Sequence, residues 1–131
     1  MVATLDPQRL EVLVVDDEPD ILEFVERALR RAYTVTTASG ADEALALVAA
    51  RRFAAIVTDH KMPRTSGLEL LDLLAGADEA MARILLSGYT ESPEVDRALV
   101  SGHLDAHAVK PIDSRSLLDI IARAIEKRRN R

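Results

Sequence analysis

Short apolar segments alternate with longer amphipathic segments along the chain. Five short runs rich in apolar and β-branched residues are predicted strands: Glu11–Val15, Tyr33–Ala38, Ala54–Thr58, Ala82–Ser87 and Asp105–Val109. The first, third and fourth runs are almost continuously apolar, as is typical of parallel strands that are covered on both faces. The fifth is predicted mainly from its place in the alternation.

Each predicted strand is followed by a segment with the periodicity of an amphipathic helix, and local signals indicate where these helices begin. Pro19 and Pro93 suit a first helical turn, where the missing N–H leaves no hydrogen bond unmade. Ser39 and Asp113 are expected N-caps, and Ser66 begins the capping-box pattern Ser-Gly-Leu-Glu. We therefore predict five helices, one after each strand.

Five strand–helix units in strict alternation predict an α/β fold with one parallel sheet and helices on both of its faces. Right-handed crossovers favour a doubly wound, flavodoxin-like sheet with strand order 2-1-3-4-5. The length of 131 residues fits a single domain, residues 1–131. Its core is expected at about residues 11–127, with a basic C-terminal tail at residues 126–131.

Composition excludes several classes of function. The chain has no cysteine, so it forms no disulfide, thiolate nucleophile or thiolate metal site. A net charge of −5 argues against direct nucleic acid binding, and the cations of the tail suit the negative end of a solvated helix terminus. No apolar run is long enough for a membrane span, and the N-terminus lacks a signal-peptide pattern. We expect a cytoplasmic protein without membrane contact.

Chemically reactive side chains stand at the ends of four predicted strands. Asp16 and Asp17 follow the first strand, Asp59 follows the third, and Ser87 and Lys110 mark the ends of the fourth and fifth. Because the carboxyl ends of parallel strands lie at the same edge of a sheet, these side chains are expected to converge there. Three neighbouring carboxylates cannot all ionise without a cation. Their oxygens favour Mg²⁺, with Mn²⁺ as a substitute.

The amine of Lys110 and the hydroxyl of Ser87 add a positive charge and a hydrogen-bond donor beside this predicted metal site. Together with Mg²⁺ they would form a cradle for a phosphoryl group, in which negative charge is compensated during transfer. Asp59, at the tip of an apolar strand, is the candidate nucleophile, because a carboxylate can accept a phosphoryl group as an acyl phosphate.

These elements together resemble the receiver domain of two-component response regulators, over about residues 11–127. The acid pair and the segments TDHKMPRTSG, LLSGY and VKP occur in the order, and after the strands, where that family has them. The resemblance implies that Asp59 is the phosphoacceptor. It further implies that Asp17, Asp59 and the backbone carbonyl of Lys61 bind Mg²⁺ directly, while Asp16 acts mainly through water.

The resemblance also assigns roles around the acceptor. Ser87 matches the switch hydroxyl that turns toward the phosphoryl group, and Lys110 pairs with the phosphorylated aspartate. The Lys110–Pro111 bond is expected to be cis, and Pro63 and Gly67 match residues that shape the loop after the acceptor. The chain would help to catalyse its own phosphorylation and dephosphorylation, without being an enzyme for another substrate.

The implied phosphoryl donor is a phosphohistidine on a sensor histidine kinase or a histidine phosphotransfer protein. Phosphorylation would remodel the face formed by the fourth helix, fifth strand and fifth helix, where Val95, Leu99 and Leu117 are candidate surface positions. An unidentified output domain or partner protein would read this face, and a homodimer through it is a further expectation. No output domain fits after Arg131, so we expect either a stand-alone receiver or part of a longer protein.

The sequence departs from the family pattern at three positions. His107 stands where an aromatic switch residue, tyrosine or phenylalanine, is usual, and we expect it to occupy that position but to couple less strongly. Lys61 places an extra cation beside the acceptor, and the resemblance implies that its position and that of Tyr89 help to set the lifetime of the phosphoryl group. Ser66 stands where aspartate is common and is expected to cap a helix.

Three other functions remain as alternatives. A pseudo-receiver that only mediates protein contacts is kept open by His107. A metal-dependent phosphohydrolase would need a second acid just after the nucleophile, where this chain has Lys61. A flavin-binding protein of the same topology would need a phosphate loop rich in serine, threonine and glycine, whereas here the first strand leads into DDEPD.

Overall fold

The structure is a computed structural model in which residues 9–88 and 92–130 are described. The strands are β1 (Glu11–Val15), β2 (Thr34–Ala38), β3 (Ala55–Asp59), β4 (Ala82–Ser87) and β5 (Ala106–Val109). The helices are α1 (Pro19–Leu29), α2 (Ala41–Ala50), α3 (Gly67–Leu73), α4 (Pro93–Ser101) and α5 (Ser114–Arg129). Every predicted strand and helix is present, and three of the strands begin one residue later than expected.

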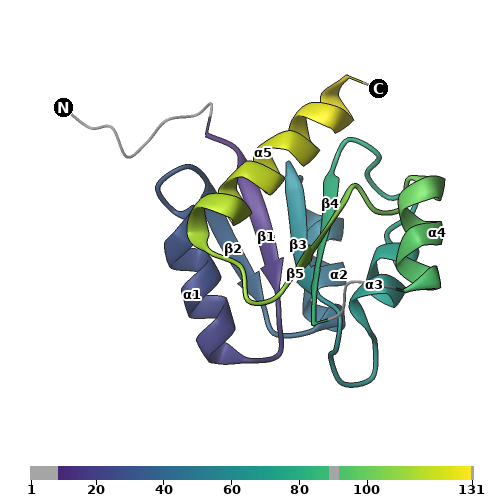
Figure 1. The fold of residues 1–131 in the computed structure, drawn as a ribbon, viewed down its shortest axis with the longest axis horizontal. Helices are drawn as coiled ribbons and strands as arrows, with labels where there is room; N and C mark the ends of the chain where they lie inside the picture. The colour runs from purple at the N-terminus through teal and green to yellow at the C-terminus, as the bar shows by residue number, and fades with distance from the viewer. Residues whose placement is uncertain (1–8, 89–91, 131) are drawn as a thin grey trace.

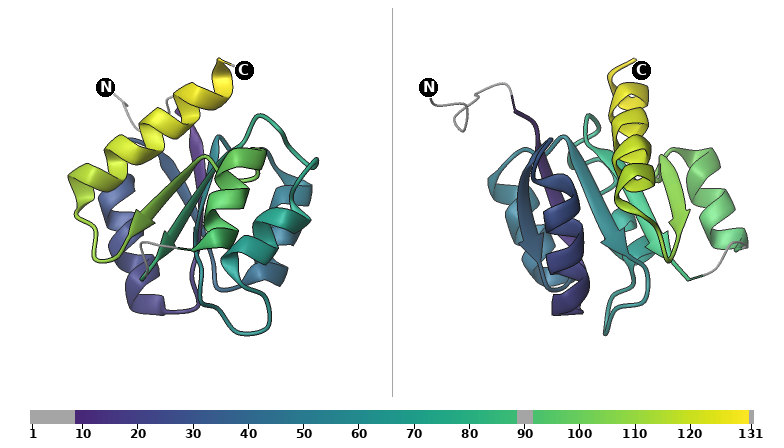
Figure 2. Two further views of the ribbon diagram at one scale, coloured as in Figure 1. Left: turned by 45° about the vertical axis from the view of Figure 1, so that its right-hand side comes forward. Right: turned by 60° about the vertical axis from the view of Figure 1, so that its left-hand side comes forward.

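The five strands form one parallel sheet in the order β2-β1-β3-β4-β5, which confirms the predicted fold class (Figure 1). Helices α1 and α5 cover one face of the sheet, and α2, α3 and α4 cover the other (Figure 2). The order places β1 and β3 side by side, with β4 and β5 following on one side. The carboxyl ends of these four strands therefore lie next to one another.

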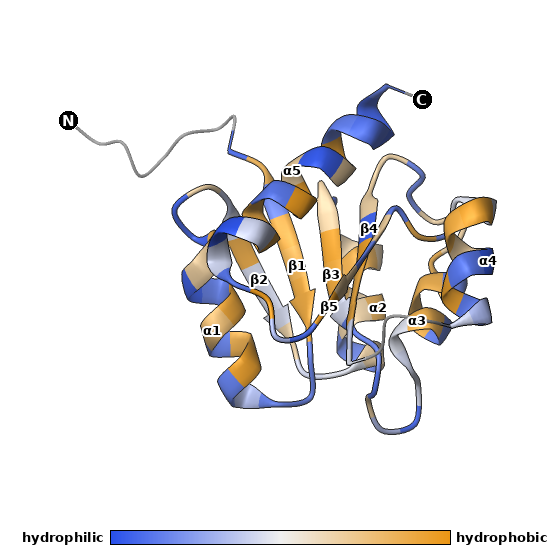
Figure 3. Cartoon of the chain, viewed as in Figure 1, coloured by the Kyte–Doolittle hydropathy of each residue, from blue (hydrophilic) through white to orange (hydrophobic). Residues whose placement is uncertain are grey.

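The sheet is buried on both faces because consecutive side chains of a strand point in opposite directions. In β1, Val12 and Val14 belong to the core shared with α1 and α5, whereas Leu13 and Val15 belong to the core shared with α2, α3 and α4. The central strands are accordingly apolar, and the C-terminal end of α5 is strongly polar (Figure 3). None of the helices in the described ranges has the length and apolarity of a membrane span.

Helix starts follow the sequence signals with one exception. Ser66 forms the predicted capping box of α3. Asp113 is the predicted N-cap of α5, and its side chain accepts the backbone N–H of Ser116. The prediction for Ser39 is wrong, because the N-cap of α2 is Gly40. The N–H and hydroxyl of Ser39 donate instead to a carboxylate oxygen of Glu43, at 2.7 and 3.2 Å. Ser39, one residue before the N-cap, is thus held by the Glu43 side chain and does not accept a hydrogen bond from the first N–H groups of α2.

The prediction of surface positions on α4 and α5 is wrong for two side chains. Val95 in α4 and Leu117 in α5 are 4% and 0% exposed, because both pack against the sheet. Leu99 is partly buried against the same core as Val95. Val100 is the large apolar side chain that α4 exposes, with 90% of its surface accessible.

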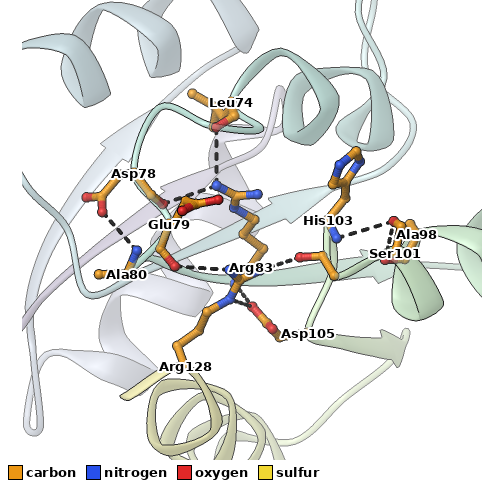
Figure 4. A network of polar contacts seen from close by, with 11 residues as sticks. Leu74, Asp78, Glu79, Ala80, Arg83, Ala98, Ser101, His103, Asp105 and Arg128 are labelled. Carbon is orange, nitrogen blue, oxygen red and sulfur yellow. Dashed lines mark hydrogen bonds and ion pairs between the residues drawn. The ribbon is translucent and has the colours of Figure 1, made fainter. Parts of the chain in front are cut away.

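A buried charge network lies where β4 and β5 begin, at the edge of the sheet opposite the strand ends that carry the predicted site (Figure 4). Nε of Arg128 in α5 lies 2.7 Å from Oδ2 of Asp105, and the same oxygen accepts the backbone N–H of Arg83 at 2.8 Å. The two Nη atoms of Arg128 donate to the backbone carbonyls of Glu79 and Gly102. The prediction of a solvated C-terminal tail is therefore wrong at Arg128, whose guanidinium is buried because each of these oxygens satisfies it.

Candidate functional site

The first two acids are positioned by the end of β1. The backbone N–H of Asp16 donates to the carbonyl of Ala38 at 3.1 Å, so pairing with β2 continues up to the acid pair. Oδ1 of Asp16 accepts the N–H of Glu18 at 2.9 Å, which orients the side chain at the start of α1. Asp16 is buried and Asp17 is exposed, so the pair offers one desolvated and one solvent-accessible carboxylate.

Asp59 is the last residue of β3, and close packing holds its backbone in place. Its side chain is 5% exposed, and the hydroxyl of Thr58 donates to the Asp59 backbone carbonyl at 2.9 Å. Gly67, the first residue of α3, approaches so closely that a Cβ atom there would lie 2.2 Å from this carbonyl oxygen. Only glycine leaves room for α3 to begin against the end of β3. The expected role of Gly67 in shaping this loop thus has a steric basis.

Lys110 reaches both buried acids from the end of β5. Its Nζ atom lies 2.6 Å from Oδ1 of Asp59 and 3.7 Å from Oδ2 of Asp16. Its backbone N–H donates to the carbonyl of Ser87 at 2.8 Å, which ties the end of β5 to the end of β4. The Lys110–Pro111 peptide bond is cis, as the resemblance implies. The reactive side chains expected at the strand ends therefore lie at one edge of the sheet.

Lys110 supplies a stable positive charge at this edge. Burial by itself would lower the pKa of its ammonium group, but the hydrogen bond and charge attraction to Asp59, with the further attraction to Asp16, raise that pKa above its ordinary value. Lys110 is therefore protonated at neutral pH. Any anion that binds at Asp59 meets this cation directly.

The three acids form a cluster that suits a hard cation. One carboxylate oxygen from each of Asp16, Asp17 and Asp59 lies within 4.8 Å of the others. Burial raises the pKa of Asp16 to about 6; the Glu18 N–H opposes this rise, and the neighbouring Asp59 carboxylate adds to it. Carboxylate oxygens in this arrangement are ligands that Mg²⁺ prefers, and a divalent ion would relieve their mutual repulsion. The donor set therefore fits the predicted metal.

Ser87, the last residue of β4, is hydrogen-bonded to His107, which lies within β5. Oγ of Ser87 lies 2.6 Å from Nε2 of His107, and Ser87 is 3% exposed. Burial lowers the pKa of His107. The neighbouring His60 lowers this pKa further, whereas Asp96 in α4 raises it. The ring is therefore mainly neutral at pH 7. The sequence indicated both residues separately, but gave no sign of this bond between them.

The other predicted participants lie in the loops around this cluster. Lys61 is exposed in the loop after β3, and the role of its backbone carbonyl as a metal ligand stays a prediction. Pro63 lies in the same loop, and Tyr89 falls outside the described residues. Sequence reasoning missed Nδ1 of His60, a buried atom without a hydrogen-bond partner among the described residues. The signal available in the sequence was that His60 directly follows the candidate acceptor Asp59.

Comparison with known proteins gives matches along most of the chain. The family model of the response regulator receiver domain matches residues 12–122. The nitrogen assimilation regulatory protein NtrX of Azorhizobium caulinodans is 36% identical over 124 residues, which cover 92% of this chain and 27% of that protein. The hydrogenase transcriptional regulatory protein HoxA of Cupriavidus necator is 31% identical over 122 residues, which cover 93% of this chain and 25% of that protein. The chain thus spans about a quarter of the length of these curated relatives.

A solved structure shares the fold over nearly the same range. The signal receiver domain of an HD domain-containing protein from Pseudomonas fluorescens Pf-5 superposes with a TM-score of 0.85 at 28% sequence identity. The match covers 95% of this chain and 100% of that domain. The order of strands and helices described above is therefore that of a known domain as a whole.

Proposed function

The chain belongs to the response regulator receiver domain family, and on this premise we propose that it is a phosphorylation-activated switch with Asp59 as its acceptor. The observation that carries the proposal is the position of Asp59, whose Oδ1 atom lies 2.6 Å from Nζ of Lys110 and beside the carboxylates of Asp16 and Asp17. Burial of Asp16 beside Asp59 raises the pKa of Asp16, which costs the fold stability, and perturbed acids of this kind are concentrated at functional sites. A purely structural role leaves this cluster unexplained.

Phosphoryl transfer would form one bond at Asp59 and break one in the donor. A carboxylate oxygen of Asp59 attacks the phosphorus of a phosphohistidine, an O–P bond forms, and the N–P bond breaks with its electron pair left on the imidazole nitrogen. Lys110 stands beside the reacting oxygen and compensates the negative charge of the phosphoryl oxygens. Ser87, at the adjacent strand end, is the hydrogen-bond donor that would turn toward the bound group.

Asp17, Asp59 and the backbone carbonyl of Lys61 would hold Mg²⁺, with Asp16 acting through water. When bound, the ion supplies positive charge that polarises the phosphoryl oxygens. The arrangement of three hard oxygen donors within 4.8 Å supports this assignment, as does the raised pKa of Asp16. Mn²⁺ suits the same ligands.

The switch would act by shifting an equilibrium between two conformations of the face formed by α4, β5 and α5. Ser87 would direct its hydroxyl proton to the phosphoryl group instead of to His107, and the ends of β4 and β5 would adjust. A partner protein, an output domain or a second copy of the chain could respond only through different affinities for the two conformations. Val100, exposed on α4, is an apolar position that such a partner could cover.

The role of the whole protein is proposed on the same basis. The donor would be a sensor histidine kinase or a histidine phosphotransfer protein in the cytoplasm. HoxA and NtrX are regulatory proteins about four times longer than the matched segment, which supports an output module as one context for this domain. Phosphorylation and dephosphorylation would be self-catalysed, without turnover of a separate substrate.

Incubation with acetyl phosphate and Mg²⁺, followed by measurement of the intact mass, tests the acceptor. We expect the wild-type chain to gain one phosphoryl group and Asp59→Asn to gain none. Asp72→Asn is the matched control, because Asp72 is a 68% exposed acid in α3 and should behave like the wild type. An unmodified wild-type chain, or phosphorylated Asp59→Asn, would contradict the proposal.

A further inference from the structure

The hydrogen bond between Ser87 and His107 can be satisfied in three ways, which differ in the protons that the ring carries: a neutral ring protonated on Nδ1, a neutral ring protonated on Nε2, and a cation protonated on both. When the ring is neutral and carries its proton on Nδ1, Nε2 is an acceptor, and Ser87 donates its hydroxyl proton across the 2.6 Å gap. When Nε2 carries a proton, in the other neutral form or in the cation, Nε2 is a donor and Oγ of Ser87 accepts. A hydroxyl has one proton, so Ser87 can donate to another group only when Nε2 carries a proton, and of the two forms that meet this condition the cation is the one that added negative charge nearby favours.

The position of Ser87 makes this choice relevant to Asp59. Ser87 directly follows Leu86, the register partner of Asp59, so it ends the strand next to the acceptor strand. It is almost fully buried, and its backbone carbonyl accepts the N–H of Lys110, the residue whose ammonium group contacts Asp59. A hydrogen bond from Ser87 to a phosphoryl group on Asp59 therefore requires the same proton that Ser87 donates to His107 when the neutral ring is protonated on Nδ1.

Resting on the function proposed above, we propose that His107 is a positioning residue that becomes protonated when Asp59 is phosphorylated. In the unmodified chain the neutral ring holds the Ser87 proton at Nε2. In the phosphorylated chain Nε2 takes up one proton from solvent and donates it to Oγ, and the hydroxyl proton of Ser87 is then donated to a phosphoryl oxygen. The phenyl ring of a phenylalanine at this position has no atom that could exchange these roles.

The groups around the ring allow both states. Burial and His60, after β3, disfavour the cation, which accounts for a neutral ring in the unmodified chain, whereas Asp96 in α4 favours the cation. A phosphoryl group adds negative charge at the acceptor edge and an acceptor for the Ser87 proton. Both additions favour a protonated ring, since a hydrogen bond to a charged group is stronger than a neutral one.

Coupling of this kind is reciprocal. If phosphorylation increases the proton affinity of His107 by a given factor, protonation of His107 stabilises the phosphoryl-bound conformation by the same factor. We expect the pKa of His107 to rise by about one unit, which corresponds to about a tenfold change in proton affinity. Mildly acidic conditions would then favour the conformation in which Ser87 contacts the phosphoryl group.

Nitrogen-15 NMR of the three histidine rings in the full chain tests this inference. The pH is varied for the unmodified chain and for the chain loaded with beryllofluoride and Mg²⁺, a stable substitute for the phosphoryl group, and His107 is assigned by the signals lost in His107→Phe. We expect the Nε2 signal of His107 to change from acceptor to protonated donor, with a raised pKa, while His103, paired with Asp72, does not change. An unchanged His107 pKa would overturn the proposal.

A second variant separates the relay from the simple field of the added negative charge. In Ser87→Ala the charge remains but the bridging hydroxyl is gone, so most of the rise in the His107 pKa should disappear. An equal rise in Ser87→Ala would show that the charge acts through space, and the relay would be wrong. The acetyl phosphate assay reports on Asp59 independently, so failure of the relay in a chain that is still phosphorylated is distinguished from failure of the proposed function.

Discussion

Nε of Arg128 lies 2.7 Å from Oδ2 of Asp105, and their side chains are 3% and 0% exposed. This ion pair fastens the last turn of α5 to the segment that leads into β5, 23 residues earlier in the chain. It lies at the edge of the sheet away from Asp59, so it contributes to the fold without taking part in the chemistry of the site. A buried pair of this kind is costly to break, because the remaining charge is left uncompensated.

Replacing Arg128 should therefore destabilise the domain strongly. We expect Arg128→Met to lower the free energy of unfolding by about 3 to 5 kcal/mol, since Asp105 loses its buried cationic partner and two carbonyls lose a donor. Urea denaturation measures the loss. Arg129→Met is the matched control, because Arg129 is exposed one residue later and its replacement should have little effect. Equal losses in both variants would show that the buried ion pair contributes no more to the free energy of unfolding than an exposed arginine does.

A side chain at position 67 should disturb both the fold and the acceptor. The Cβ atom in Gly67→Ala would lie 2.2 Å from the Asp59 carbonyl oxygen, so the end of β3 or the start of α3 must move. We expect a loss of about 1 to 3 kcal/mol in stability, with slower phosphorylation by acetyl phosphate. Gly88→Ala is the control for stability, because a Cβ atom there meets nothing within 4 Å. A Gly67→Ala chain as stable as Gly88→Ala would contradict the steric argument.

Asp16 should make the metal-free chain less stable as the pH rises. Its pKa is about 6 in the folded chain, against 3.8 for an ordinary aspartate, so between these values the folded state binds more protons than the unfolded state. The free energy of unfolding therefore falls as the pH rises from about 4 to about 6. We expect Asp16→Asn to lack this fall and to be more stable at pH 7 by about 1 to 3 kcal/mol. The measurement is denaturation at several pH values in the presence of a chelator. If Asp16 were not the cause, the free energy of unfolding would change with pH in the same way in wild type and in Asp16→Asn.

Mg²⁺ binding should weaken as the pH falls through the same range. A proton on Asp16 removes one of the negative charges that attract the ion, so the apparent affinity should fall by up to about tenfold per pH unit below pH 6. Isothermal titration calorimetry measures this directly. Asp16→Asn should bind Mg²⁺ more weakly at pH 7.5, with a smaller pH dependence. Retention of the full pH dependence in that variant would assign it to another group.

The exposed cation at position 61 should affect the lifetime of the phosphoryl group. Lys61 lies two residues after Asp59, and its ammonium charge stabilises a nearby dianionic group by an amount typical of exposed charges. We expect Lys61→Ala to shorten the half-life by about 1.5- to 5-fold, as followed by intact mass after removal of acetyl phosphate. Lys127→Ala, an exposed cation near the end of α5, should leave the half-life unchanged. The same half-life in wild type and Lys61→Ala would refute this role.

The sequence by itself predicted the five strands, the five helices and the edge of the sheet that gathers Asp16, Asp17, Asp59 and Lys110. These features depend on local patterns, because continuous apolar runs, helical periodicity and capping residues are encoded within a few positions. Once the strands are known to be parallel, the meeting of their carboxyl ends follows from topology. The family resemblance added the expected roles of these residues.

Tertiary structure decided the features that depend on contacts between distant segments. The burial of Arg128 by Asp105 and the contact of Ser87 with His107 join residues 23 and 20 positions apart, and their free energy depends on exact distances that no periodic pattern specifies. The same is true of Val95, whose helix could have turned toward solvent, and of Gly67, whose need for a missing Cβ arises only where α3 meets β3. Side-chain packing and desolvation are set by three-dimensional neighbours, and a local pattern does not contain them.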